Sequence, residues 1–195
     1  MSKATPKTNA MRQLDATKIP YEVLTYEVDE NDLSGTHIAE QIGLPLPMVF
    51  KTLVAKGDKT GHLVFCIPVD REIDLKAAAT LTGNKRIEMV HVKDLLGLTG
   101  YIRGGCSPIG MKKKFPTYFD ASAADHEKIT VSAGVRGAQM LVEREVLVRF
   151  VDGTLIDVAR KGMEFFEKRG EDLRVCGLLL FFHWGDLTGC QKLQS

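Results

Sequence analysis

Apolar and polar positions along the chain predict short helices alternating with strands. Apolar residues recur at helical spacing in residues 8–18, with Thr8 as the N-cap, and residues 21–28 alternate as a strand does. Apolar runs at 50–56 and 62–69 flank a turn and indicate a hairpin. Further helices are expected at 36–42, 74–82, 93–96 and 143–150, and further strands at 86–90, 117–120, 128–132 and 154–158. This irregular order favours an α+β fold with a mixed sheet over strict βαβ units.

The composition is that of an ordinary globular protein. The chain has 195 residues, of which 44% are hydrophobic and 26% charged. A formal net charge of +1 gives no overall field for a polyanion, so any contact with nucleic acid must be local. Four cysteines and five histidines show no CxxC or HExxH spacing, so neither a disulfide scaffold nor a metal site is predicted.

Targeting signals are not recognised in the chain. The N-terminus lacks the apolar core of a signal peptide, and the longest apolar stretch, within residues 176–184, falls far short of the roughly 20 residues of a membrane span. We therefore expect a reduced, cytoplasmic protein that does not contact a membrane.

The composition changes near residue 160. Residues 161–174 are strongly charged, and an apolar run, CGLLLFFHW, follows them. We expect one folded domain over residues 1–160 and a C-terminal extension over residues 161–195. The extension is either a further helix docked on the domain or a poorly ordered appendage, and the sequence favours neither.

The segment richest in candidate chemistry is the loop over residues 99–114. Gly104 and Gly105 allow the backbone to approach a ligand closely and to present free amides to an anion. Arg103 and the lysines at 112–114 add positive charge beside them. A phosphate or a developing oxyanion would suit this loop, whereas the alternative is a glycine turn beside solvated lysines.

Familiar motifs do not fit this loop. Met111 stands where a P-loop has its lysine, Pro108 interrupts the segment, and Ser107 lies in GCSPI rather than GxSxG. Cys106 lies beside glycines and cationic residues, a setting that lowers a thiol pKa. Because no motif pairs it with a histidine, a small filler residue in a turn is the stronger interpretation. No protein nucleophile is therefore identified.

Two further segments offer candidates for a cleft. Lys51 is expected to share a strand face with Leu53, which is costly unless the lysine has a partner or borders a cleft. Tyr26 either lines the same cleft or is an ordinary strand aromatic. Ser132 and Arg136 lie in VSAGVRG, which is either a plain hairpin turn or a second wall around a polar ligand.

Five segments carry a resemblance over about residues 8–158: KTNAMRQLDATKIPYEVLTYEVDE, VFKTLVA, IPVDREIDLKAAA, TGYIRGGCSPIGMKKKFPT and VSAGVRG. Together they resemble the bacterial YbaK/EbsC family of Cys-tRNA(Pro)/Cys-tRNA(Cys) deacylases, relatives of the editing domain of prolyl-tRNA synthetase. The resemblance implies an α+β fold with a mixed, partly barrel-like β-sheet flanked by helices. The C-terminal extension has no counterpart in the family.

The resemblance also implies an activity. Family members remove cysteine in trans from mischarged Cys-tRNA(Pro), and the thiol of the substrate is thought to attack its own ester, which requires no cofactor. Aminoacyl-tRNA is then the partner, with prolyl-tRNA synthetase as a possible third member of the complex. Two alternatives stay open: an Ala- or Ser-tRNA deacylase that uses water, and a non-catalytic module that binds tRNA ends or a synthetase.

Site residues follow from the family motifs. Lys51 would orient the terminal nucleotide, and the amide of Gly104, with Gly105 beside it, would bind the oxyanion. The expected substrate-binding residues are Tyr26, Thr52, Ser107, Ser132 and Arg136. Charge alone predicts contacts with the tRNA backbone for three lysines, Lys112, Lys113 and Lys114. The chain departs from the family pattern at residues 29–37 and at Gln139, where some members carry an acidic residue.

Overall fold

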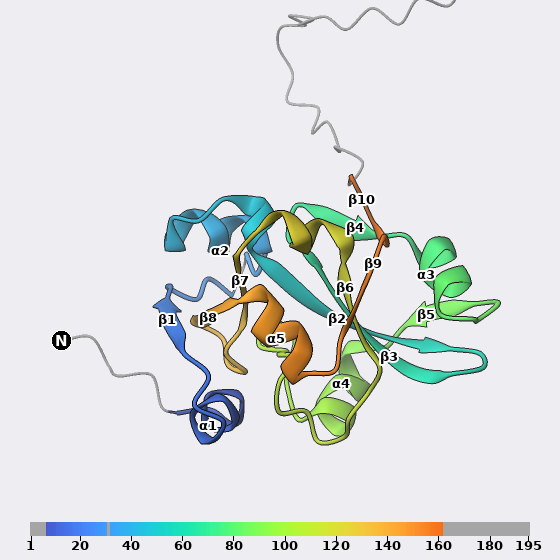
Figure 1. Ribbon diagram of the computed structural model, residues 1–195, viewed down its shortest axis with the longest axis horizontal. Coiled ribbons are helices and arrows are strands. Elements are labelled where there is room, and N and C mark those ends of the chain that lie inside the picture. Colours follow the sequence, from blue (N-terminus) through green and yellow to red (C-terminus); the bar gives the residue numbers. More distant parts are fainter. Residues whose placement is uncertain (1–6, 31, 162–195) are drawn as a thin grey trace, which may run out of the picture. The chain divides into compact units, whose positions relative to one another are not determined.

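A computed structural model describes residues 7–30 and 32–161, which form an α+β fold (Figure 1). The helices are α1 (Asn9–Ala16), α2 (Gly35–Ile42), α3 (Leu75–Leu81), α4 (Val92–Thr99) and α5 (Arg144–Phe150), with 3-10 turns η1 (Leu46–Met48) and η2 (Ala121–Asp125). The strands are β1 (Tyr21–Thr25), β2 (Phe50–Gly57), β3 (Gly61–Pro68), β4 (Arg71–Ile73), β5 (Ile87–Met89), β6 (Thr117–Asp120), β7 (Lys128–Ser132), β8 (Ala138–Glu143), β9 (Thr154–Ile156) and β10 (Ala159–Lys161). The predicted class is confirmed.

Three sheets organise the described residues. The largest has the order β5-β2-β3-β6-β9, with β3, β6 and β9 parallel to one another and the other pairs antiparallel. An antiparallel sheet follows the order β1-β8-β7, and β4 pairs with β10. A bridge between Val49 and Thr130 joins the two larger sheets. Within residues 7–30 and 32–161 the sheets stay open, so the barrel-like part of the prediction does not extend to a closed barrel.

The central hairpin has the predicted position. Strands β2 and β3 pair along their whole length, from Phe50 opposite Pro68 to Gly57 opposite Gly61. Successive residues of β3 point to opposite faces, and both faces are covered: Val64 and Cys66 belong to one hydrophobic cluster and Phe65 to another. This two-sided burial explains the unbroken apolar run in the sequence.

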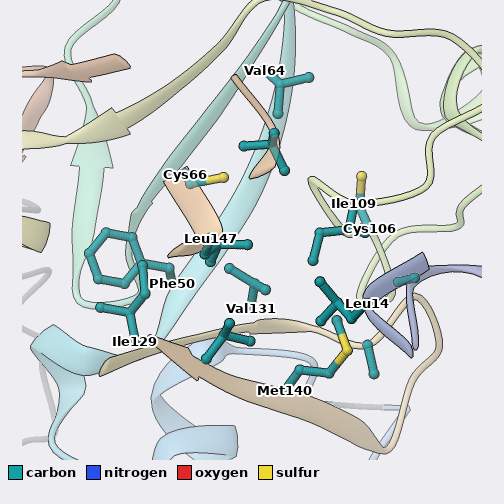
Figure 2. Close-up of a cluster of buried hydrophobic side chains, with 14 of the residues drawn as sticks. Leu14, Phe50, Val64, Cys66, Cys106, Ile109, Ile129, Val131, Met140 and Leu147 are labelled. Atoms are coloured by element: carbon teal, nitrogen blue, oxygen red, sulfur yellow. The ribbon is translucent and has the colours of Figure 1, made fainter. Parts of the chain in front are cut away.

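The larger core lies between the two main sheets. Leu14 of α1, Ile109 of the glycine-rich loop and Met140 of β8 converge there with Phe50 of β2 and Leu147 of α5 (Figure 2). All five are almost fully buried. The core therefore ties the glycine-rich loop to both sheets, and this fixes the loop beside β2.

Helix ends follow the expected capping chemistry. Thr8 accepts a hydrogen bond from the N–H of Met11, and Ser34 does the same for His37. Gly43 ends α2 in the left-handed conformation, which glycine adopts readily. No helix among the described residues is long and apolar enough to cross a bilayer. A cytoplasmic location stays a prediction.

Several elements differ from the sequence-based prediction. The strand predicted over 21–28 ends at Thr25, and the predicted helical turn at 93–96 is the complete helix α4. The sequence-based prediction contains no strand at the positions of β4, β8 or β10. Strands β4 and β10 are three residues each and exist because Glu72 and Arg160, far apart in the chain, meet in register. The predicted extension over residues 161–195 lies outside the described residues except for Lys161, and its boundary stays a prediction.

Candidate active site

A cavity of about 540 Å³ opens between β2, the start of α2, the region of α4, the glycine-rich loop and the paired ends of β7 and β8. Among the residues in its wall are Lys51 and Thr52 of β2, Gly104 of the glycine-rich loop, and Ser132 of β7. Four of the residues predicted from the sequence therefore meet around one space, although they are spread over more than 80 positions of the chain.

Lys51 supplies a partly desolvated cation to this cavity. Its ammonium donates a hydrogen bond to the carbonyl of Val69 at 3.1 Å. Burial lowers the pKa of Lys51, while the carboxylates of Glu72 and Asp70 act in the opposite direction. An ammonium has three N–H donors, so two remain for a ligand. An anionic group such as a phosphate is the natural partner for them.

The two glycines of the glycine-rich loop differ in what their amides do. Gly104 has a φ of +83°, and its N–H makes no hydrogen bond with any described residue. The N–H of Gly105 donates to the carbonyl of Ile102 at 3.0 Å. Gly105 is therefore not available as an oxyanion donor, and of this pair only Gly104 presents a free amide.

Gly105 has a packing role instead. A Cβ atom there would lie 3.2 Å from the backbone of Val135, in the second glycine-containing turn. Arg136 strengthens the same junction, since its Nε donates to the carbonyl of Arg103 at 3.0 Å and its guanidinium lies 3.5 Å from the carboxylate of Glu30. Arg136 is not in the cavity wall, and its hydrogen bond to Arg103 holds the glycine-rich loop in place.

The cavity lacks a nucleophile paired with a base. Its wall, as far as the described residues form it, contains no histidine and no carboxylate. Cys106 is in the wall, but burial raises the pKa of its thiol to about 12, which contradicts the idea of a low-pKa thiolate. The hydroxyls of Thr52 and Ser132 have no neighbouring base in this wall. The cavity offers positive charge, a free amide and hydroxyls, and these bind and polarise a substrate without attacking it.

Comparison with known proteins identifies the family. Residues 34–150 match the aminoacyl-tRNA editing domain, which accounts for more than half of the chain. The chain belongs to this family. The predicted resemblance is confirmed, and membership makes the protein an aminoacyl-tRNA editing enzyme of the deacylase class.

Individual relatives of this editing family agree. The chain is 46% identical over 159 residues to EbsC of Enterococcus faecalis (strain ATCC 700802 / V583), provisionally named a Cys-tRNA(Pro)/Cys-tRNA(Cys) deacylase, and the match covers 82% of this chain and 97% of that one. The solved structure of a protein named only as APE2540 has a TM-score of 0.71 at 18% identity, covering 78% and 100% of the two chains. A provisional trans-editing enzyme for prolyl-tRNA synthetase has a TM-score of 0.67 at 20% identity, covering 81% and 99%. These two structures share the fold.

Several residues that the family motifs suggested lie outside the wall of this editing-domain cavity. Tyr26 bonds through its backbone N–H to the carbonyl of Gly137. Ser107 is fully buried, and its hydroxyl accepts from the N–H of Ile109. Neither side chain is brought to the cavity, so their predicted substrate contacts are without support from the geometry.

The three lysines predicted to contact tRNA also lie away from the editing cavity. Lys112 donates to the carbonyl of Leu96, at the C-terminal end of α4, and Lys114 pairs with Asp152 at 3.3 Å. Lys113 and Lys114 border a separate depression of about 290 Å³. Their contact with the tRNA backbone stays a prediction.

Sequence reasoning overlooked the role of one wall residue in this editing domain. Gln139 lies in the cavity wall, but the sequence marked it only as a departure from the family pattern. It stands opposite Ser132 on the β7–β8 pair, so both side chains point to the same face. The alternation of apolar and polar residues over 138–143 could have predicted this strand and the face that Gln139 occupies. The segment is short and lies between a glycine-containing turn and a helix, so the alternation was overlooked.

Proposed function

We propose that this protein is a trans-editing deacylase that removes cysteine from Cys-tRNA(Pro). The observation that carries the proposal is a cavity with a cation and a free amide, whose described wall has no nucleophile–base pair. Such a site suits a substrate that brings its own nucleophile. Cysteinyl esters do so, and the provisional name of the 46% identical relative points to the same substrate.

In the proposed reaction the substrate thiol attacks its own ester carbonyl. A bond forms between the sulfur and the carbonyl carbon, the bond from that carbon to the ribose oxygen breaks, and the thiol proton ends on the released ribose hydroxyl. The products are a cyclic thiolactone and free tRNA. Well-oriented intramolecular attack reaches effective molarities of about 10⁵–10⁸ M, so positioning accounts for much of the rate.

Four wall residues and Arg136 have roles in this proposal. The two free N–H donors of Lys51 hold a phosphate oxygen of the terminal nucleotide, with Thr52 beside it. The amide of Gly104 stabilises the negative charge that develops on the carbonyl oxygen. Ser132 lines the aminoacyl end. Arg136 acts indirectly, by holding the glycine-rich loop through Arg103.

The need for such an enzyme follows from the limits of binding selectivity. One methylene of difference in a pocket discriminates by only about 10–200-fold, and cysteine and proline are close in size. A synthetase that confuses them therefore requires a second site. We propose that residues 1–160 form this deacylase domain, and that prolyl-tRNA synthetase delivers the substrate.

A deacylation assay over Cys-, Ala-, Ser- and Pro-tRNA(Pro) tests the proposal. We expect selective loss of the cysteinyl ester with thiolactone among the products, which alanyl and seryl esters cannot form. Lys51→Ala should abolish the activity, whereas Lys56→Ala, an exposed lysine of the same strand, should not. Release of alanine or serine as free acid would assign the enzyme to water-dependent hydrolysis, and tight tRNA binding without turnover would make it a binding module.

A further inference from the structure

Gln139 is a buried polar side chain without a partner. Only 5% of its surface is exposed, and its amide oxygen has no hydrogen bond. The side chain makes no hydrogen bond to any residue that the structure describes. Because an unsatisfied buried oxygen costs stability, its retention in a wall position calls for a functional explanation.

The strand register directs this amide to the cavity. On the β7–β8 pair, Val131 stands opposite Met140 and both belong to the main core. The next pair, Ser132 and Gln139, therefore points to the other face, where both side chains contribute to the cavity wall. The torsion that orients a glutamine amide is broad, so rotation about it can present the amide oxygen to a ligand in the cavity.

The wall of the cavity is rich in hydrogen-bond donors and poor in acceptors. Lys51, Arg103 and the amide of Gly104 all donate, and no carboxylate is present in the described wall. Apart from hydroxyls, the amide oxygen of Gln139 is the acceptor that the side chains of this wall provide. We therefore infer that the amide oxygen of Gln139 accepts a hydrogen bond from a donor group on the substrate.

We propose that Gln139 is a specificity-determining residue that accepts a hydrogen bond from the free α-amino group of the bound aminoacyl ester. This inference rests on the proposed deacylase function. The amino group is a strong donor, whereas the substrate thiol is a weak one and would not compensate a buried amide oxygen. A protonated α-amino group donates a charge-assisted hydrogen bond, whereas the single amide N–H of an N-acylated or peptidyl ester is a weaker, neutral donor beside a bulky acyl group. The site therefore favours aminoacyl esters with a free amine.

Steady-state kinetics with Cys-tRNA(Pro) and N-acetyl-Cys-tRNA(Pro) test this assignment. Replacing the amide with an apolar chain of similar length, Gln139→Met, should raise KM for Cys-tRNA(Pro) about tenfold, with a smaller change in kcat. It should leave KM for the acetylated ester unchanged, so the preference for a free amine falls by the same factor. Gln139→Glu keeps an acceptor and should hold KM for Cys-tRNA(Pro) near or below that of the wild type.

Thermal unfolding separates recognition from a structural role. Gln139→Met removes no hydrogen bond within the protein, so its Tm should equal or exceed that of the wild type. Thr130→Val is the matched control. The Thr130 hydroxyl, on the same pair of strands, is also buried and has no hydrogen-bond partner in the described part of the chain, but it lies outside the cavity wall. This control should also keep or raise Tm, and it should not change either KM.

The outcomes distinguish this inference from the proposed function. If the wild type cleaves Cys-tRNA(Pro) and Gln139→Met keeps both its KM and its preference for a free amine, the role of Gln139 is refuted while the deacylase stands. If Gln139→Met does not fold, a tenfold rise in the KM of Gln139→Glu for Cys-tRNA(Pro) would also refute the role of Gln139. A wild type that cleaves no aminoacyl ester would overturn the proposed function itself.

Discussion

Lys51 reaches the cavity from β2, a strand most of whose residues are buried or half-buried. Its ammonium donates a hydrogen bond to the carbonyl of Val69. Gly104 reaches the same space through a left-handed backbone conformation that side chains rarely adopt. Both positions lower the stability of the fold: Lys51 because its ammonium is desolvated, and Gly104 because its loop is conformationally constrained. This combination is typical of residues kept for function rather than for folding.

Replacing the cation should separate stability from activity. Burial lowers the pKa of Lys51 below its ordinary 10.5, so between the two values the unfolded chain binds more protons than the folded one. Wild-type stability should therefore rise with pH through this window relative to Lys51→Met. At neutral pH the variant should be at least as stable as the wild type and lack activity. Urea unfolding from pH 7 to 10.5 checks this, and an identical pH dependence of both proteins would contradict it.

Gly104→Ala should impair catalysis far more than folding. The left-handed φ costs an alanine about 1 kcal/mol, and the new Cβ would lie 3.3 Å from Nε of Arg136, which displaces the amide. Loss of one oxyanion donor lowers kcat by about 10²–10³. Gly83→Ala is the matched control, because Gly83 has a φ of +74° and open space around it. We expect both variants to lose the same amount of Tm, and only Gly83→Ala to keep full activity. Full activity in Gly104→Ala would exclude the Gly104 amide as an oxyanion donor.

Two glycine-containing turns and a strand pair position the cavity wall. The turn after β7 is held by the Ser132 hydroxyl, which accepts from the N–H of Gly134, and it contacts the glycine-rich loop through Arg136 and Gly105. Neither turn would be rigid alone, because each has few of the backbone hydrogen bonds that regular helices and strands contain. Their mutual packing explains how flexible sequence types form a defined wall.

The end of β6 illustrates how one side chain joins elements. The carboxyl group of Asp120 is buried and accepts from the N–H groups of Val158 and Ala159, at 3.1 and 2.8 Å, and from Ser122. Asp120→Ala leaves these donors unpaired and should lower the free energy of unfolding by about 3 kcal/mol. Asp74→Ala, which removes only a half-buried helix cap, should cost about 1 kcal/mol. Denaturant titration gives both values, and equal losses would refute the bridging role.

The net charge of the 195-residue sequence affects how strongly the protein binds tRNA. A net charge of +1 provides little general attraction, so we expect affinity for RNA to come from local cations and from the proposed delivering partner. The cavity itself supplies Lys51 and Arg103, which suffice for a terminal nucleotide but not for an acceptor stem. We therefore expect weak binding of free tRNA, strengthened when prolyl-tRNA synthetase is added.

Lys113 is the cation best suited to test contact with the tRNA backbone, because Lys112 and Lys114 already have protein partners. Lys113→Ala should weaken binding of cysteinyl- and prolyl-tRNA(Pro) equally and reduce the salt slope, d log K/d log[salt], by about 1. Lys128→Ala, an exposed lysine at the start of β7, is the control. Fluorescence anisotropy over a salt series measures both slopes. An unchanged slope in Lys113→Ala would place the tRNA elsewhere.

Much of the architecture was predictable because its determinants are local. Thr8 and Gly43 mark helix ends by capping chemistry that depends on neighbouring residues, and the hairpin of β2 and β3 follows from two apolar runs and a turn. Strands β4 and β10 could not be predicted in this way. Each is three residues long and is defined only by the other, 85 or more positions away.

The linear order of residues thus determines the fold class, the family and the types of chemical group that the cavity contains, because these depend on local pattern and composition. Tertiary structure alone decides which of these groups act together. It brings Lys51 and Gly104 to one cavity wall and places Tyr26 outside that wall. It also engages the N–H of Gly105 in a hydrogen bond to Ile102. It also buries Gln139 without a hydrogen-bond partner among the described residues, since the register of β7 and β8 sets which face each side chain occupies.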